Sequence, residues 1–232
     1  MRSALITALI LISGTVFSQV SPGEISLLEK LDSVGNSVSP AKHFARLYIT
    51  ATANAIYFWQ TRTEEEKKLN RRFERRFASY FFSAADSFRN GKKIPEEWSS
   101  YFHTSDTSLL QYQLLGINAH INGDIWKTLT AEFSSSELKL YKNSFLAFNK
   151  TLNKQYFSLY EESLIRNRRM RFLHQITYGM DRWYCSQMPL KWRKRQMKLA
   201  EIYYSKPALF LRKEKSLSKK KLRLDKAIIN IF

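Results

Sequence analysis

The residues best placed to do chemistry are His120 and Asp124, which stand four apart in the stretch "LLGINAHINGDIW" at residues 114–126. On a helix, side chains at this spacing lie one turn apart on the same face, with Cβ atoms about 6 Å apart. The two side chains could hold one divalent cation, zinc being our first choice, or act together in acid–base catalysis. Asn118 and Asn122 repeat the spacing on the other flank, and all four could instead form a buried polar network that fixes helix register.

This reading depends on a helical backbone, which the neighbouring segments favour. As a strand, the stretch would place His120 and Asp124 about 13 Å apart, too far to share one ion. As a helix, the stretch has an apolar stripe along one face. The opposite face has a patch of small residues, where another helix could approach closely. The stripe is Leu114, Ile117, Ile121 and Ile125, and the patch is Gly116, Ala119 and Gly123.

The run from Asn118 to Asp124 resembles the signature of a bacterial family known only as domain of unknown function 5995. That signature is Asn-Ala-His-Ile-Asn-x-Asp within an all-helical domain, and it matches residues 118–124 position by position. Weaker similarities, "FARLYITAT", "FSAADSFRNGKKIPEEW" and "FLAFNKTLN", extend the resemblance over about residues 40–155. Because the family has no established activity, the resemblance marks a site and leaves its chemistry open.

The His-x-x-x-Asp spacing is also similar to that of zinc-dependent phospholipases C and P1-type nucleases, which are secreted helical enzymes. Those families carry many more ligands than this chain, which has 4 histidines. We therefore expect at most a mononuclear site, completed by one or two further groups. The candidates are His174 and Asp181, seven residues apart on one predicted helix, and His43, which opens an early helix.

The rest of the chain predicts an all-α protein, a single bundle of about six to eight helices. Capping boxes begin helices after Thr63 and Ser134, and Gly91 is a natural helix end. A further helix is expected over residues 164–188, ended by Pro189. No hairpin signal separates alternating runs, and no internal repeat is visible.

The N-terminal residues of the chain predict that the protein is exported. Met1-Arg2 is followed by an apolar run from Ala4 to Phe17, so residues 1–18 read as a signal peptide with Gln19 first in the mature chain. The protein is then periplasmic, attached to the cell envelope or extracellular. Cys185 is the only cysteine, so a folded monomer contains no disulfide.

Positive charge is concentrated at the C-terminal end. Residues 163–232 hold 19 basic and 4 acidic residues, most of the formal net charge of +18. We divide the mature chain into a helical domain at residues 19–205 and a basic tail at 206–232, which fits either an interfacial helix or one docked on the bundle. Such a field gathers polyanions, so an anionic membrane surface or an envelope polyanion is the expected partner. Nucleic acid is not expected, since no recognition motif is present.

Two functions follow from these residues. The first is a metal-dependent hydrolase of an ester or phosphoester, in which His120 and Asp124 hold a cation that lowers the pKa of bound water. The second is a non-catalytic, envelope-associated protein whose basic C-terminal third binds anionic surfaces. In that case the motif of His120, Asp124, Asn118 and Asn122 is structural.

Overall fold

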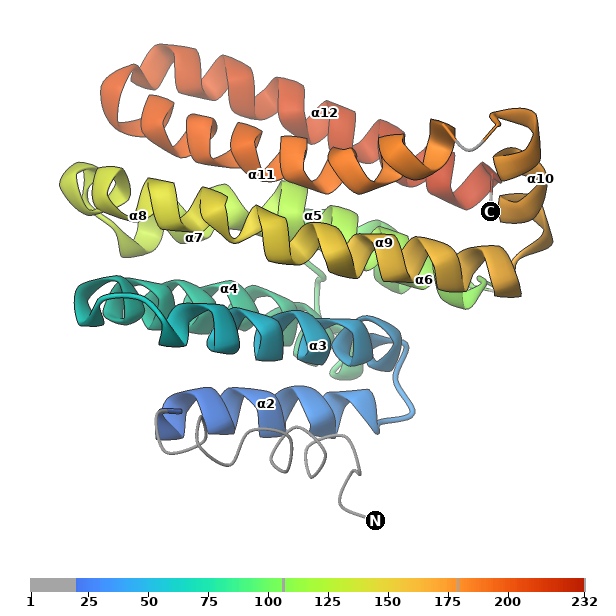
Figure 1. Ribbon diagram of the computed structural model, residues 1–232, viewed down its shortest axis with the longest axis horizontal. Coiled ribbons are helices and arrows are strands. Elements are labelled where there is room, and N and C mark those ends of the chain that lie inside the picture. Colours follow the sequence, from blue (N-terminus) through green and yellow to red (C-terminus); the bar gives the residue numbers. More distant parts are fainter. Residues whose placement is uncertain (1–19, 106, 179, 232) are drawn as a thin grey trace.

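The computed structural model describes residues 20–105, 107–178 and 180–231, which form helices α2 to α12 with no strand among them (Figure 1). The predicted all-α class is confirmed. The predicted signal peptide at residues 1–18 lies outside the described ranges and stays a prediction. No helix of the described part is long and apolar enough to cross a membrane.

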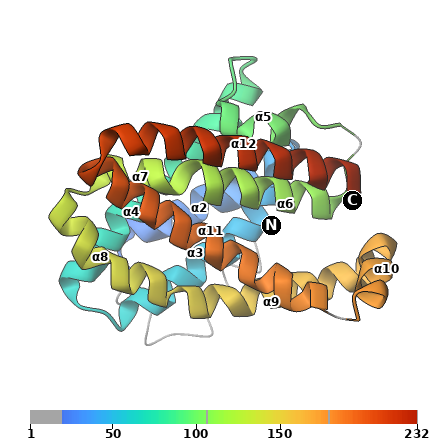
Figure 2. The same cartoon turned by 90° about the horizontal axis from the view of Figure 1, so that it is seen from above.

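The helices stack in layers, as Figure 1 shows: α2, then α3 and α4, then α5 to α9, and finally α11 and α12. Figure 2 shows α12 lying along α6 and α7, while α11 runs from α7 toward α9. The elements are α2 Pro22–Gly35, α3 Ala41–Gln60, α4 Glu64–Arg89, α5 Glu96–His103, α6 Leu109–Ala119, the π-helix η2 His120–Asp124, α7 Ile125–Glu132, α8 Ser135–Ala147, α9 Asn149–Arg166, α10 Arg168–Ile176, α11 Met180–Ser205 and α12 Pro207–Ile231.

Helix starts follow the local capping signals. Both predicted capping boxes are present, with the Thr63 side chain accepting from the backbone of Glu66 and the Ser134 side chain accepting from the backbone of Glu137. Gly91, just beyond the end of α4, adopts a φ of 61°, a left-handed conformation that glycine reaches without steric cost.

The described residues contain more helices than expected because long periodic stretches are interrupted. One break lies at Phe148, between α8 and α9, and another at Asn167, between α9 and α10. The helix predicted over residues 164–188 is therefore divided among α9, α10 and α11. Pro189 lies inside α11 and does not end it. The residues that follow it, Leu190 and Trp192, pack against the core, and this packing outweighs the hydrogen bond that proline removes.

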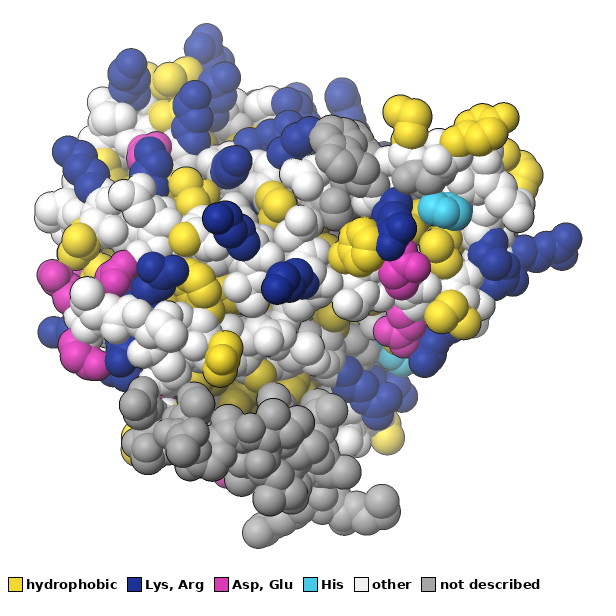
Figure 3. Space-filling view, viewed as in Figure 1, with side chains coloured by type: hydrophobic (Ala, Val, Ile, Leu, Met, Phe, Trp, Pro, Cys, Tyr) yellow, Lys and Arg dark blue, Asp and Glu magenta, His cyan; other side chains and the backbone are white. Residues whose placement is uncertain are grey.

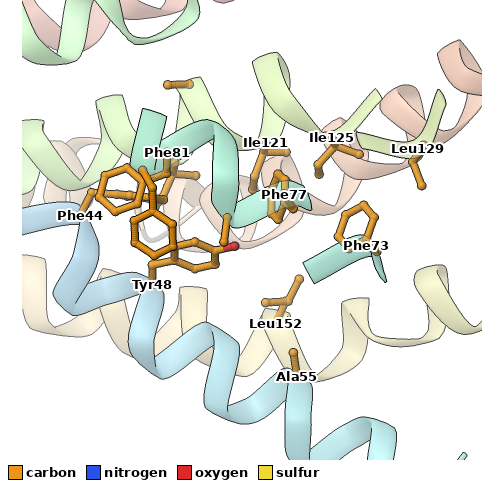
Figure 4. Packing of buried hydrophobic residues seen from close by; sticks show 14 of the residues in the cluster. Phe44, Tyr48, Ala55, Phe73, Phe77, Phe81, Ile121, Ile125, Leu129 and Leu152 are labelled. Carbon is orange, nitrogen blue, oxygen red and sulfur yellow. The ribbon is translucent and has the colours of Figure 1, made fainter. Parts of the chain in front are cut away.

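An aromatic core holds the layers together (Figure 4). Trp98, Tyr101, Tyr141, Phe73 and Phe81 are among the largest fully buried side chains. Their polar atoms are satisfied: the Tyr141 hydroxyl donates to Asn70 Oδ1 at 2.9 Å, and the Tyr101 hydroxyl donates to the carbonyl of Pro40 at 2.7 Å. Burial of this many rings is the main favourable contribution to the folding free energy.

The basic C-terminal segment is part of the bundle. It forms α12, which packs on α6 and α11 and buries Ile228 in the same core (Figure 2). Of the two arrangements that its sequence allows, the structure has the docked one. Its lysines mostly face outward, and Lys221 is a buried exception.

Candidate functional site

The candidate site begins at a widened helical turn. Helices α6 and α7 are joined by the π-helix η2, whose five residues run from His120 to Asp124. Asn122 and Gly123 are weak helix formers, so the regular hydrogen-bond ladder is easily altered here. The predicted helical backbone is confirmed, and single π turns occur frequently at functional sites.

His120 and Asp124 contact each other directly across this turn. His120 Nδ1 lies 2.9 Å from Asp124 Oδ2, and the two side chains are only 4% and 2% exposed. The same carboxylate oxygen accepts a hydrogen bond from Trp98 Nε1 at 3.0 Å. With Asp124 ionised, its carboxylate has only lone pairs to offer, so His120 Nδ1 carries the hydrogen and Nε2 keeps a free lone pair.

Burial acts on both members of the pair. It lowers the pKa of His120 well below its ordinary value, so the imidazole is neutral at neutral pH. Burial also raises the pKa of Asp124 well above its ordinary value, although the Trp98 hydrogen bond opposes that rise. The pair is thus a hydrogen-bonded dyad in a dry environment rather than an exposed ion pair.

Aromatic rings fix the plane of the imidazole. The Phe77 ring of α4 stacks on His120 with ring centroids 3.5 Å apart and an interplanar angle of 16°. From α3, the edges of Tyr48 and Phe44 approach it, with centroid distances of 4.6 and 5.4 Å. Figure 4 shows Phe44, Tyr48 and Phe77 among the packed side chains of the core. A ring clamped in this way cannot reorient Nε2 without disturbing the core.

His120 lines a partly open cavity of about 80 Å³, which is bounded mainly by apolar side chains of α3, α4 and α9. Tyr48 and Thr52 line the same cavity. Within the described part of the chain, His120 Nε2, Tyr48 Oη and Thr52 Oγ1 are all buried without a hydrogen-bond partner. Buried polar atoms are seldom left unpaired, so three around one space indicate a place for water or for a polar ligand atom.

Two groups of opposite charge complete the wall of this cavity. Burial raises the pKa of Glu74 to about 7, and the nearby Arg193 opposes the rise. Arg193 is itself buried, and it donates to Asn149 Oδ1 at 2.8 Å and to the carbonyl of Phe145 at 3.1 Å. Burial lowers the pKa of Arg193. The cavity therefore combines a neutral base, two hydroxyls, a carboxyl group and a fixed guanidinium.

A surface groove of about 930 Å³ between α2 and α4 lies beside this cavity. Thr52 and Glu74 line both the groove and the cavity, so the two spaces meet at these residues. The groove is rich in cationic side chains, namely Lys30, Lys68, Arg71, Arg72, Arg75 and Lys92. Its size is that of a small-molecule site, and its charge suits an anionic ligand.

The two asparagines belong to a separate, largely buried network on the other flank of η2. Asn122 donates to Asn118 Oδ1 at 2.8 Å, which confirms the predicted pairing. Asn118 in turn donates to Asp225 Oδ1 of α12 at 2.7 Å, and Lys221 donates to Asp225 Oδ2 at 2.7 Å. Lys221 also donates to the carbonyl of Glu97 in α5. This network ties α5, α6 and α12 together.

The other predicted helper residues are elsewhere. His43 stacks on Tyr112 with ring centroids 4.8 Å apart, and His174 is hydrogen-bonded to Tyr160 at 2.8 Å between its Nδ1 and the hydroxyl oxygen. Neither histidine lines the cavity. The side chain of Asp181 lies outside the described residues, as does that of Cys185.

The described residues form no complete zinc site around the dyad. Among the described residues no group of three His, Cys, Asp or Glu side chains could hold a metal ion. His120 Nδ1 and Asp124 Oδ2 are already hydrogen-bonded to each other, whereas a catalytic zinc site takes three protein ligands. Metal binding by His120 and Asp124 stays a prediction for direct measurement.

Several residues of the site were not predicted from the sequence, although some of them stand out in their sequence context. Thr52 is a polar residue four positions after Tyr48 on the apolar stripe of residues 41–60. Glu74 is a lone acid among the arginines of "RRFERRF", and Lys221 and Asp225 repeat the spacing of His120 and Asp124 inside a basic run. Which of these side chains meet depends on contacts between helices far apart in sequence.

The fold and the site define an all-helical protein with a buried His–Asp dyad beside a partly open cavity. The chain belongs to the Family of unknown function (DUF5995), whose family model matches residues 25–229. This match includes the basic C-terminal third, beyond the stretch of about residues 40–155 that the motifs alone cover. No curated protein and no solved structure matches the chain.

Proposed function

We propose that the protein is a hydrolase of small anionic esters or phosphoesters in which His120 acts as the general base. The observation that carries this proposal is the basic Nε2 of a buried dyad, unpaired among the described residues and lining a cavity that meets a surface groove. A dyad that served only to lock helices would need no space beside it. The proposal differs from the metal-dependent reaction expected from sequence, because it gives Asp124 the role of orienting the imidazole through their hydrogen bond.

In the proposed reaction, His120 Nε2 accepts a proton from a water molecule in the cavity as that water attacks the ester carbonyl or the phosphorus. The new oxygen bond forms, the bond to the leaving oxygen breaks, and the proton passes from Nε2 to the leaving alcohol. Asp124 stabilises the imidazolium that exists between these steps. The hydroxyls of Tyr48 and Thr52 are the groups available to donate to the developing oxyanion.

The two spaces suggest a substrate of defined shape. A cavity of about 80 Å³ with apolar walls suits a small acyl or alkyl group. The cationic groove suits a negatively charged remainder. Lys68 and Arg75, both exposed and without an ion pair among the described residues, are the side chains most able to bind that charge.

The test is hydrolysis of p-nitrophenyl acetate, butyrate and phosphate by the purified protein, with and without chelator. We expect His120→Gln to reduce the rate by at least about 100-fold. The matched control is His43→Gln, which changes a partly buried histidine outside the cavity and should keep the rate. Circular dichroism confirms that both variants are folded.

The results separate the mechanisms. Activity that survives chelator and depends on His120 supports the metal-independent reaction. Loss of activity on chelation, with recovery on adding zinc, would replace it with the metal-dependent one. A rate that His120→Gln leaves unchanged would contradict any catalytic role of the dyad.

A non-catalytic role has its own support. Figure 3 shows Lys and Arg side chains gathered over the layer of α11 and α12, as an anionic-surface binder requires. In that case the network of Asn118, Lys221 and Asp225 holds the basic helix on the bundle. Absence of hydrolysis of every ester tested, together with salt-sensitive binding to anionic surfaces, would favour this second function.

A further inference from the structure

We propose that α10 and the turn that follows it form a docking surface for a bilayer that contains anionic lipids. This inference concerns the end of the bundle that carries α10, away from the cavity, and does not rest on the proposed hydrolase function. It assigns membrane contact to a few apolar residues at this end and not to the basic helix α12. We call this surface the α10 tip, comprising Ile165, Arg168, Phe172, Ile176, Tyr178 and Met180.

The α10 tip exposes large apolar side chains. Phe172 and Ile176 are 62% and 56% exposed, and Ile165, Tyr178 and Met180 are 78%, 95% and 75% exposed. Figure 3 shows hydrophobic side chains gathered over α10, with Lys and Arg beside them. Scattered single exposures are ordinary, but a contiguous apolar patch on a soluble protein marks an interaction surface.

One face of helix α10 packs on the bundle, and apolar side chains also lie on the face that points away from it. Met170 is buried, and α10 packs against α9. Phe172 and Ile176 are four residues apart and about 200–240° around the helix from Met170, so both face away from the bundle. The core therefore uses one face of α10 and leaves the other without a partner among the described residues.

The charge of the segment complements an anionic surface. Residues 165–178 contain four arginines and no Asp or Glu. The nearest carboxylates of α9 are engaged, since Glu162 pairs with Arg166 at 3.0 Å and Glu161 pairs with Arg182 at 2.9 Å. Arg168 is exposed and has no ion-pair partner among the described residues. Guanidinium groups bind phosphate through paired hydrogen bonds, which suits a lipid headgroup.

The tip is held in shape before any contact is made. Arg171 Nη1 donates to the carbonyls of Leu164 and Ile165 at 3.0 and 2.7 Å, which fixes the joint between α9 and α10. Tyr178 adopts a φ of 51°, a left-handed conformation that is unusual for a residue with a side chain. That conformation belongs to an almost fully exposed tyrosine, a residue type enriched where membranes meet water.

The experiment is flotation of the purified protein with vesicles of phosphatidylcholine alone or of an equimolar mixture with phosphatidylglycerol. We expect binding to the mixed vesicles and a loss of about tenfold or more in the variant Phe172→Ser with Ile176→Ser. The matched control changes Tyr57→Ser and Leu211→Ser, two apolar side chains that are 65% and 68% exposed on α3 and α12. This control should bind as the unchanged protein does.

A second set of variants tests whether the positive charge of the α10 tip contributes to vesicle binding. Arg168→Gln should weaken binding to the mixed vesicles about fivefold, and Lys219→Gln on α12 should have a smaller effect. Absence of binding by the unchanged protein, or equal losses in the apolar variant and its control, would overturn the proposal. So would a protein dimer, seen by sedimentation velocity, that the apolar variant dissociates without any effect on vesicle binding.

Discussion

His120 Nδ1 and Asp124 Oδ2 lie 2.9 Å apart within a single π-helical turn, and this contact is sealed from solvent by the aromatic side chains of α3, α4 and α5. Trp98 is the only other side chain hydrogen-bonded to the carboxylate of Asp124 among the described residues. Each member of the dyad thus depends on the other for its polar environment. This mutual dependence predicts a coupling free energy between His120 and Asp124. Unfolding experiments can measure it whether or not the site is catalytic.

Removal of the His120 or the Asp124 side chain should leave the other buried without its hydrogen-bond partner. His120→Ala and Asp124→Ala should each lower the free energy of unfolding by about 1–3 kcal/mol through the unsatisfied group that remains. The double variant should cost clearly less than the sum of the two, because the second change then removes no further interaction. Urea unfolding of the four proteins in the cycle measures this coupling. Additive effects would mean that the hydrogen bond does not form in solution.

The small residues of the same stretch should tolerate no added bulk. A Cβ at Gly116 would lie 2.3 Å from Phe44 Cδ2, and one at Gly123 would lie 2.6 Å from Glu97 Cγ. We expect Gly116→Ala to lower the unfolding free energy by about 1–3 kcal/mol, and Gly123→Leu to lower it at least as much.

Gly23 of α2 is the control for these two glycines. It has no atom within 4 Å of its added Cβ, so Gly23→Ala should be neutral or slightly stabilising. Thermal unfolding of the three variants gives the comparison. Equal midpoints for Gly23→Ala and Gly116→Ala would show that α3 and α6 pack less closely than described.

The fold class was predictable because helical signals are local. Capping residues such as Thr63 and Ser134 act within one turn, and their predicted helices begin where expected. Pro189 shows the limit of such signals, since packing of the residues after it carries α11 through the proline. A proline was expected to end the helix at this point, but the tertiary contacts of the following residues stabilise a continuous helix.

The site was predictable only in part, for the same reason. The spacing of His120 and Asp124 is enough to bring them together within one segment. Tyr48, Thr52 and Glu74 reach the same cavity from two other helices, and no local pattern can show which side chains meet across helix interfaces. Metal binding by the dyad stays a prediction, because spacing alone cannot distinguish two ligands of one ion from two partners of one hydrogen bond.

Glu74 should make stability depend on pH. Burial raises the pKa of its carboxyl to about 7 in the folded state, against an ordinary value of 4.5. Between these values the folded protein binds more protons than the unfolded chain, so the contribution of Glu74 to stability falls as pH rises from about 4.5 to about 7. The total change should be about 1–3 kcal/mol, because part of the side chain faces the groove.

The measurement is the difference in unfolding free energy between the unchanged protein and Glu74→Gln across this pH range. We expect the unchanged protein to lose stability relative to the variant as pH rises, with a plateau above about 7. Glu29→Gln changes an exposed glutamate of α2 and should give no comparable slope. A flat difference for Glu74→Gln would mean that the carboxyl is solvated in the folded protein.

Lys221 and Asp225 provide the last prediction, which concerns whether α12 is an appendage or part of the fold. Their side chains are 4% and 2% exposed, and they bond to each other at 2.7 Å while contacting α5 and α6. A buried ion pair contributes little net stability, but breaking it leaves an uncompensated charge inside the protein.

Asp225→Ala should therefore lower the unfolding free energy by about 3–5 kcal/mol, because it leaves Lys221 buried without its counter-charge and removes an acceptor from Asn118. Asp86→Ala breaks an ion pair whose members are 56% and 71% exposed, and it should cost less than about 1 kcal/mol. The apolar double variant Lys221→Met with Asp225→Leu should recover much of the loss, since no charge is then stranded. Denaturant unfolding measures all three. If Asp225→Ala cost no more than Asp86→Ala, α12 would be separable from the bundle, and the C-terminal segment would be the independent basic tail that its composition suggests.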